Sequence, residues 1–209
     1  ATLFEIGSIT KTFTAFVLET VLKENGISDS SSIINYLPDS VKANKALKDI
    51  SFLSLLNHTS GLARLPDNLD LTDDYMIPYD NYTPEEFFLY LKTCTPVPNG
   101  KSNYSNLGAA LAGVLAERIT GRSYFDLLDQ YVFTPFGLGK SNKSLEVVNK
   151  AQGYFNNDKA LYWGTSIMGP AYVLKSNADE LLDYLEYMAI PTDSAAKLVI
   201  EQLLIPTLA

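Results

Sequence analysis

The sequence is poor in the residues that most often mark a catalytic or metal site, because it has one cysteine, Cys94, and one histidine, His58. A single cysteine permits no intrachain disulfide, and we interpret Cys94 as an ordinary buried or loop thiol because no feature links it to the histidine. The histidine count argues against a Ser-His-Asp triad and against a multi-histidine metal site. A hydrolase built on this chain therefore needs a base other than histidine.

Two further features are missing. No apolar run reaches the roughly 18 residues of a membrane span, and the first residues lack the basic and apolar regions of a signal peptide. The 16 basic residues are scattered, and the net charge is −8 with a pI near 4.6, which argues against a nucleic-acid partner. A hydrophobic fraction of 46% and a charged fraction of 19% are typical of a globular protein with a core. We expect one domain over residues 1–209.

Hydrophobic spacing and capping residues predict a chain that is largely helical. The predicted helices cover residues 8–25, 51–57, 83–93, 107–120, 123–131, 176–188 and 194–206. The clearest start is Thr83-Pro84-Glu85-Glu86, which has a capping threonine, a proline at the first helical position and a glutamate three residues after the cap. A strand is predicted at 152–155, and 59–82 is a long loop of the kind that often lines a site.

The first predicted helix carries Ser8 and Lys11 three residues apart, so that the hydroxyl and the amine lie on one face. A partly desolvated lysine can serve as the base that makes a serine nucleophilic. A serine at a helix start also lies near backbone N–H groups that can stabilise an oxyanion. Taken alone, the motif favours a simpler interpretation, a capping serine followed by a solvated lysine.

Neighbouring sequence favours the catalytic interpretation. Residues 4–14, FEIGSITKTFT, closely resemble the active-site segment of class C β-lactamases and of related penicillin-binding proteins and esterases. Residues 55–62, LLNHTSGL, resemble a later helix-to-loop signature of that family, and 101–108, KSNYSNLG, contain its Tyr-x-Asn element. Residues 151–154 and 169–185 are also similar to family sequence, in the expected order. The resemblance therefore covers nearly the whole chain.

The resemblance implies an α/β (α+β) β-lactamase/transpeptidase-like fold and assigns roles to individual residues. Ser8 would be the acylated nucleophile, Lys11 would help to deprotonate it, and Tyr104 would act as a second base or proton shuttle, as a phenolate or through Lys11. Asn106 would hydrogen-bond Lys11 or a substrate amide, and could also cap the helix that follows. His58 would have a structural role in a loop turn. Outside this context, Tyr104 would be interpreted as an ordinary buried tyrosine. Neither a metal nor a cofactor is implied.

One family element is not found. The family carries a Lys-Thr-Gly or His-Thr-Gly motif on a strand beside the site, and it places strands before the Ser-x-x-Lys helix. Here that helix begins almost at residue 1, and helical sequence follows 169–185. We therefore expect 1–209 to be an incomplete domain that covers mostly the helical part and lacks the N- and C-terminal strands of the sheet. Such a chain would have little activity alone and would associate through the exposed surface that faces the sheet.

The resemblance implies a serine hydrolase that forms an acyl-enzyme on an amide, β-lactam or ester carbonyl. Its substrate would be a β-lactam, a D-amino-acid peptide or an ester, as for a β-lactamase, a D-Ala-D-Ala carboxypeptidase or an esterase. The alternative is a penicillin-recognising sensor or binding protein that is acylated without turnover. A third interpretation, a helical interaction protein with chance motifs, does not account for the number and order of the matches. Family members usually act in the periplasm, at the cell surface or as secreted proteins.

Overall fold

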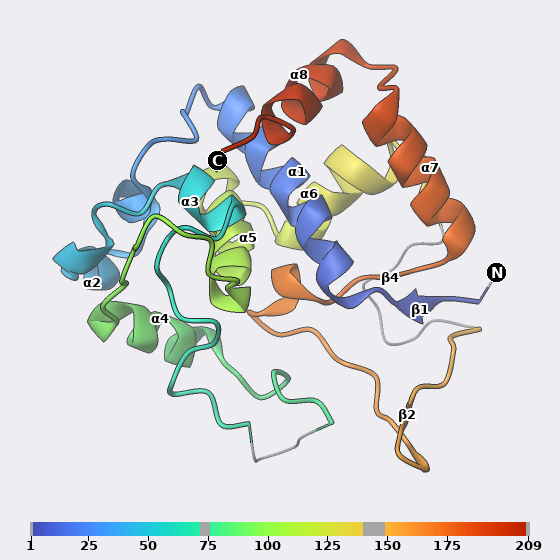
Figure 1. Cartoon of the computed structure of the whole chain (residues 1–209), viewed down its shortest axis with the longest axis horizontal. Helices are drawn as coiled ribbons and strands as arrows, with labels where there is room; N and C mark the ends of the chain where they lie inside the picture. The colour runs from blue at the N-terminus through green and yellow to red at the C-terminus, as the bar shows by residue number, and fades with distance from the viewer. Residues whose placement is uncertain (1, 72–75, 140–148, 208–209) are drawn as a thin grey trace.

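The computed structural model describes residues 2–71, 76–139 and 149–207, and this part of the chain is mostly helical (Figure 1). The α-helices are α1 (Thr10–Glu24), α2 (Asp39–Lys42), α3 (Phe52–Leu56), α4 (Pro84–Thr93), α5 (Asn106–Thr120), α6 (Tyr124–Leu128), α7 (Ala178–Ala189) and α8 (Ser194–Leu203). Short 3-10 turns are η1 (Gly7–Ile9), η2 (Ile33–Tyr36), η3 (Lys45–Leu47) and η5 (Gly169–Ala171), and η4 (Asp129–Phe133) is a π-helical turn.

The core is built around α1 and α5, which pack against each other near the centre of the molecule (Figure 1). In α5 every residue from Leu107 to Ala116 is buried, and the alanines and glycines among them let neighbouring segments approach closely. The other face of α1 contacts the aromatic side chains of later segments. Phe13 stacks on Tyr184 with ring centroids 4.2 Å apart, and Phe16 meets Phe136 edge-on at 5.1 Å. Helix α1 is therefore enclosed by elements from both halves of the chain.

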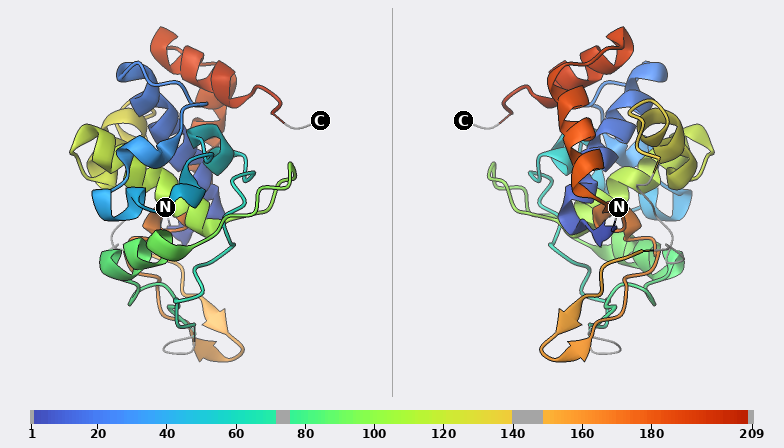
Figure 2. Two further views of the ribbon diagram at one scale, coloured as in Figure 1. Left: turned by 90° about the vertical axis from the view of Figure 1, so that its left-hand side faces the viewer. Right: turned by 90° about the vertical axis from the view of Figure 1, so that its right-hand side faces the viewer.

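Two small antiparallel sheets occur in the described residues. Strand β1 (Phe4–Glu5) pairs with β4 (Lys175–Ser176), with Phe4 opposite Ser176. Strands β2 (Tyr154–Phe155) and β3 (Asp158–Lys159) form a hairpin that extends away from the helices (Figure 2). The hairpin confirms the second half of the strand predicted at 152–155, whereas 152–153 are not in a strand. The β1–β4 pair joins the start of α1 to the segment that enters α7, and this pairing holds the site described below.

The strongest sequence signals for helix starts are confirmed. Thr83 caps α4, its side chain accepts a hydrogen bond from the N–H of Glu86, and the Glu86 carboxylate accepts one from the N–H of Thr83. Helix α5 ends at Gly121, whose φ of 70° lies in the left-handed region that favours glycine. Over the described part of 59–82 neither helix nor strand interrupts the predicted loop.

Two predicted boundaries are wrong. The sequence predicts that Ser176 begins the helix at 176–188, but Ser176 lies in β4, and Asn177 caps α7 by accepting a hydrogen bond from the N–H of Glu180. Ser176 is instead held in the extended conformation because it pairs with Phe4. Ser8 lies in η1, one turn before α1 proper begins at Thr10.

Among the described residues, none of the helices is both long enough and apolar enough to cross a membrane.

Candidate active site

Ser8 lies on an exposed 3-10 turn at the start of α1. Gly7 has a φ of 51°, which favours glycine and lets the chain leave β1 and turn directly into η1. Lys11, in the first turn of α1, donates a hydrogen bond from Nζ to Ser8 Oγ at 3.0 Å. The predicted pairing of the hydroxyl and the amine is therefore present in the structure.

Tyr104 reaches the same hydroxyl from a distant part of the chain. Its OH donates to Ser8 Oγ at 2.7 Å, and Lys11 Nζ lies 4.8 Å from the centroid of its ring. Tyr104 is 38% exposed, so it is not an ordinary buried tyrosine. Three residues chosen from sequence, Ser8, Lys11 and Tyr104, thus meet at one oxygen atom.

A backbone carbonyl holds the lysine in place. Lys11 Nζ donates to the carbonyl oxygen of Ala171 at 2.7 Å. Ala171 lies in η5, just before β4, and the N–H of Leu174 donates to Thr10 Oγ1 at 3.2 Å, which fastens the segment to α1. Sequence analysis missed this ligand of Lys11, because a backbone carbonyl leaves no residue-type signal.

The titration behaviour of the site follows from these contacts. Burial lowers the pKa of Lys11 below its ordinary value, the positive charge of Arg64 adds to this effect, and Tyr104 partly opposes it. For Tyr104, burial alone would raise the pKa, but hydrogen bonding with Lys11 and Ser8 and the charges of Lys11 and Arg64 together lower it. The lowered pKa values bring the deprotonated forms of Lys11 and Tyr104, which can accept a proton, nearer to neutral pH.

In the described part of the chain, Asn106 makes no hydrogen bond to Lys11. Its amide nitrogen donates to the hydroxyl of Tyr79 at 3.2 Å, and among the described residues its Oδ1 atom is buried without a hydrogen-bond partner. The expectation that Asn106 caps α5 is wrong, because Ser105 is the cap and its hydroxyl accepts the N–H of Gly108 at 2.8 Å. An acceptor that is buried without a partner is energetically costly.

His58 supports the turn that presents Tyr104. Its backbone has a φ of 62°, its Nδ1 accepts the N–H of Ser105 at 3.3 Å, and its carbonyl accepts the N–H of Asn103 at 2.7 Å. The imidazole lies against the Tyr104 ring, with centroids 4.6 Å apart. Burial and then the charge of Lys11 lower the pKa of His58, which favours the neutral ring that accepts this hydrogen bond.

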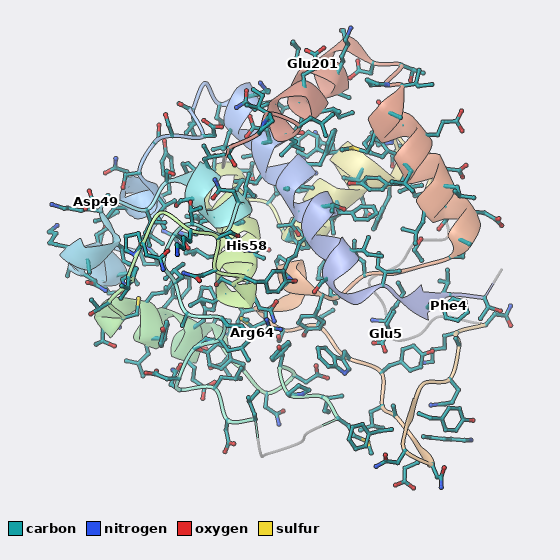
Figure 3. The ribbon with its side chains drawn as sticks, in the orientation of Figure 1. Phe4, Glu5, Asp49, His58, Arg64 and Glu201 are labelled. Atoms are coloured by element: carbon teal, nitrogen blue, oxygen red, sulfur yellow. The ribbon has the colours of Figure 1, made fainter. Side chains whose placement is uncertain are left out.

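Arg64 is a residue at the site that sequence analysis did not single out. Its guanidinium carbon lies 5.2 Å from the centroid of the Tyr104 ring, and its carbonyl oxygen accepts the N–H groups of Asn106 and Leu107 at 3.0 and 3.3 Å. Both His58 and Arg64 therefore contact the segment that leads into α5 (Figure 3). Because Arg64 lies in a loop, neither spacing nor periodicity marks it.

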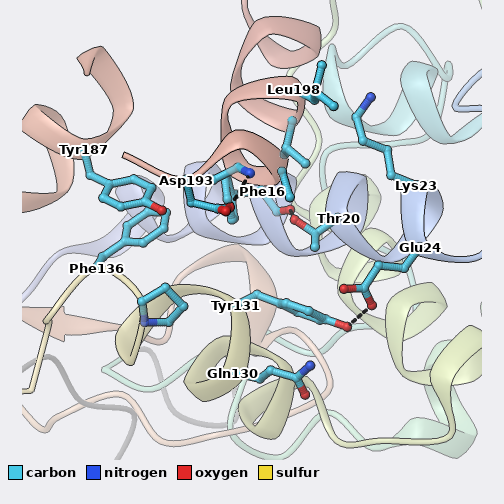
Figure 4. Close-up of a pocket in the computed structure, with 14 residues that line it drawn as sticks. Phe16, Thr20, Lys23, Glu24, Gln130, Tyr131, Phe136, Tyr187, Asp193 and Leu198 are labelled. Atoms are coloured by element: carbon cyan, nitrogen blue, oxygen red, sulfur yellow. Dashed lines mark hydrogen bonds between the residues drawn. The ribbon is translucent and has the colours of Figure 1, made fainter. Parts of the chain in front are cut away.

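A separate cavity of about 350 Å³ lies away from Ser8, and Figure 4 shows its lining. The walls come from α1, η4, α7 and α8 and include Phe16, Tyr131, Phe136, Tyr187 and Leu198. None of the candidate catalytic residues lines it. In the described residues no group of three or more histidine, cysteine or acidic side chains is arranged to hold a metal ion.

Comparison with known proteins identifies the family. The family model described as Beta-lactamase matches residues 1–206. The chain belongs to the Beta-lactamase family. It is 32% identical over 191 residues to a beta-lactamase of Providencia stuartii, covering 88% of this chain and 46% of the relative. It is also 29% identical over 153 residues to penicillin-binding protein 4* of Bacillus subtilis, covering 66% of this chain and 30% of that protein.

Solved structures of the family have the same fold. A beta-lactamase/D-alanine carboxypeptidase from Pseudomonas syringae is similar with a TM-score of 0.79 at 25% identity, covering 95% of this chain and 55% of the other. A class C beta-lactamase from Rhodobacter sphaeroides gives a TM-score of 0.78 at 22% identity, covering 96% and 56%. The predicted β-lactamase/transpeptidase-like fold is therefore confirmed. The chain spans about half the length of these relatives.

Proposed function

We propose that this Beta-lactamase family chain carries the acylation machinery of a serine hydrolase. The observation that supports it most directly is the convergence of Lys11 Nζ and Tyr104 OH on Ser8 Oγ, at 3.0 and 2.7 Å. Ser8 Oγ attacks an amide, β-lactam or ester carbonyl, and the bond between that carbon and its nitrogen or oxygen substituent breaks to leave an acyl-enzyme. Water then releases the acid.

The proton released by Ser8 passes to the Lys11–Tyr104 pair, which must first be short of one proton. The lowered pKa of Lys11 and the lowered pKa of Tyr104 both favour that state. The same pair returns the proton to the leaving nitrogen or oxygen, so the charges balance over acylation. Because the two groups interact closely, they titrate as a pair and share one proton vacancy.

A backbone contact prepares the site for this step. The carbonyl oxygen of Ala171 accepts a hydrogen bond from Lys11 Nζ at 2.7 Å. This contact holds the lysine amine within reach of Ser8. The Oδ1 atom of Asn106 is buried, so it could accept a substrate amide N–H only after the side chain rotates. Relatives named as beta-lactamase and as penicillin-binding protein are consistent with amide and lactam substrates. We place the activity outside the cytoplasm, as the family resemblance implies.

The test is the intact mass of the chain after incubation with benzylpenicillin or with an activated aryl ester. We expect an increase equal to the added penicillin or acyl group, and its loss in Ser8→Ala. Ser30→Ala is the matched control, because Ser30 is also exposed but lies outside the site. Adduct formation does not require a complete hydrolytic cycle, so low turnover would not hide it.

The outcomes separate the candidate activities. An adduct that decays, with release of product, supports a hydrolase. An adduct that persists supports the penicillin-recognising binding protein instead. Unchanged mass and no turnover with either reagent, for a folded sample, would rule out Ser8 as a nucleophile in this chain.

A further inference from the structure

Arg64 is fastened to the catalytic segment through its backbone. The carbonyl oxygen of Ala63 accepts the hydroxyl of Ser105 at 2.7 Å, and the carbonyl oxygen of Arg64 accepts the N–H groups of Asn106 and Leu107. The residues between Gly61 and Arg64 thus keep a fixed position relative to Tyr104. The side chain of Arg64 is exposed and projects over the Tyr104 ring, with its guanidinium carbon 5.2 Å from the ring centroid.

Arg64 has no ion-pair partner in the part of the chain that the structure describes. No carboxylate of an aspartate or glutamate in that part lies within 4 Å of the guanidinium group. The other charge at the site is Lys11, whose Nζ lies 4.8 Å from the same ring. The pKa of Lys11 is affected by the charges of Tyr104 and Arg64, and the pKa of Tyr104 by those of Lys11 and Arg64. No carboxylate is among these charges. A chain with a net charge of −8 therefore has two neighbouring cations at its candidate nucleophile.

An unpaired guanidinium group is well suited to bind a carboxylate, because its planar N–H fork can donate two parallel hydrogen bonds. The guanidinium carbon lies 5.2 Å from the centroid of the Tyr104 ring, and the hydroxyl of that ring contacts Ser8 Oγ at 2.7 Å. We propose that Arg64 is a specificity-determining residue that binds a carboxylate group of the substrate and makes the site prefer acyl compounds that carry one. This inference rests on the proposed function, because it concerns the substrate of the same site.

A competing role is purely electrostatic, since the positive charge of Arg64 lowers the pKa of both Lys11 and Tyr104. That role would change the reaction of neutral and anionic substrates equally. A binding role would change only the reaction of the anionic one. Two esters with the same leaving group and chain length, 4-nitrophenyl hydrogen glutarate and 4-nitrophenyl valerate, separate the two roles.

We expect the chain to be acylated faster by the glutarate ester than by the valerate ester. Arg64→Gln should lower the ratio of their second-order acylation rates about tenfold, the loss of one charge-assisted contact, and Arg64→Lys should retain part of the preference. Arg122→Gln is the matched control, because Arg122 is an exposed arginine just beyond the C-terminal end of α5 and should leave the ratio unchanged. An equal loss for both esters, or an unchanged ratio in Arg64→Gln, would overturn the proposal.

A second measurement does not depend on catalysis. Monomethyl glutarate should bind Ser8→Ala with its Arg64 intact, as followed by NMR titration, and dimethyl glutarate should not. Adding Arg64→Gln to Ser8→Ala should abolish the binding of monomethyl glutarate. If neither ester acylates the chain but this Arg64-dependent binding is seen, the proposed function fails and the carboxylate site stands. If acylation depends on Ser8 but monomethyl glutarate binds equally without Arg64, the carboxylate site fails alone.

Discussion

Gly113 and Pro170 are in direct contact, and a Cβ atom at Gly113 would lie 2.3 Å from Cγ of the proline ring. Gly113 is in the buried part of α5, and Pro170 immediately precedes the residue whose carbonyl binds Lys11. The absence of a side chain at one helix position therefore sets how close η5 lies to α5. The position of the Ala171 carbonyl depends on it.

Gly113→Ala should reduce both stability and acylation. An alanine in a helix is ordinarily favourable, but here the methyl group must displace Pro170, and overpacking of this kind costs about 1–3 kcal/mol. We expect urea unfolding at a lower midpoint and slower adduct formation at Ser8. Gly139→Ala is the control, because no atom lies within 4 Å of the added methyl group and φ there is not positive. Equal stability of the two variants would contradict this account.

The pH dependence of acylation should show the lowered pKa values of the base pair. The pair must lose a proton to act, so the rate should rise with pH and reach its plateau below the ordinary lysine value of 10.5. Arg64→Gln removes a positive charge that lowers the pKa of both Lys11 and Tyr104, and it should move this rise to higher pH. Stopped-flow acylation by 4-nitrophenyl valerate across pH 6–10 measures it. A rise in the acylation rate of Arg64→Gln at lower pH than in the parent chain would contradict this prediction.

Glu19 should destabilise the fold at neutral pH. It is 4% exposed, and burial, with the nearby charge of Asp29, raises its pKa, although Lys23 opposes this from 3.9 Å. A carboxyl with a raised folded pKa contributes most below its unfolded value near 4.5 and loses that contribution as pH rises through the folded value. Glu19→Gln should therefore stabilise the chain at pH 7, by about 1 kcal/mol, and have little effect at pH 4.

Glu201→Gln is the matched control for this prediction. Glu201 pairs with Lys197 at the same 3.9 Å distance and i,i+4 spacing, but both side chains are more than half exposed. Exposed pairs of this kind contribute little, so the change in unfolding free energy should stay within about 0.5 kcal/mol at either pH. Thermal or urea unfolding at the two pH values tests both variants, and an equal stabilisation by both would show that burial is not the cause.

Exposed leucines on α7 should promote association between chains. Leu182 and Leu185 are 63% and 59% exposed, a large apolar area for a helix surface. The double variant Leu182→Lys, Leu185→Lys should lower the proportion of oligomer seen by sedimentation velocity. Leu89→Lys is the control, since Leu89 is 56% exposed on the separate helix α4. A monomeric parent chain at concentrations of tens of micromolar would contradict the predicted association.

The parts of the site that could be predicted from sequence are those with a local signal. The spacing of Ser8 and Lys11 places both on one face, so the 3.0 Å contact is geometrically expected, but only the neighbouring family sequence favoured it over a solvated lysine. Thr83 and Glu86 form a capping box that is complete within four residues. Tyr104 lies 96 residues from Ser8, and only the family resemblance placed the two together.

The parts that could not be predicted depend on partners far away in the chain. Ser176 has the residue type of a helix cap, and its pairing with Phe4 overrides that preference. Asparagine and serine are both good helix caps. Ser105 is the cap because its backbone is extended while Asn106 is already the first residue of α5. Arg64 lies in a loop, where the sequence has no helical or strand periodicity that would mark it.

The hydrogen bond from Lys11 to Ala171 joins residues 160 positions apart, and it has a consequence for the order in which the protein is made. At ribosomal speeds of about 5–20 residues per second, roughly 8–32 s separate the synthesis of Lys11 from that of its carbonyl ligand. Tyr104 is made part-way through that interval, but Lys11 has no carbonyl ligand until Ala171 has been made. The contacts that position the Ser8 hydroxyl and Lys11 are therefore complete only after the η5 segment has been synthesised.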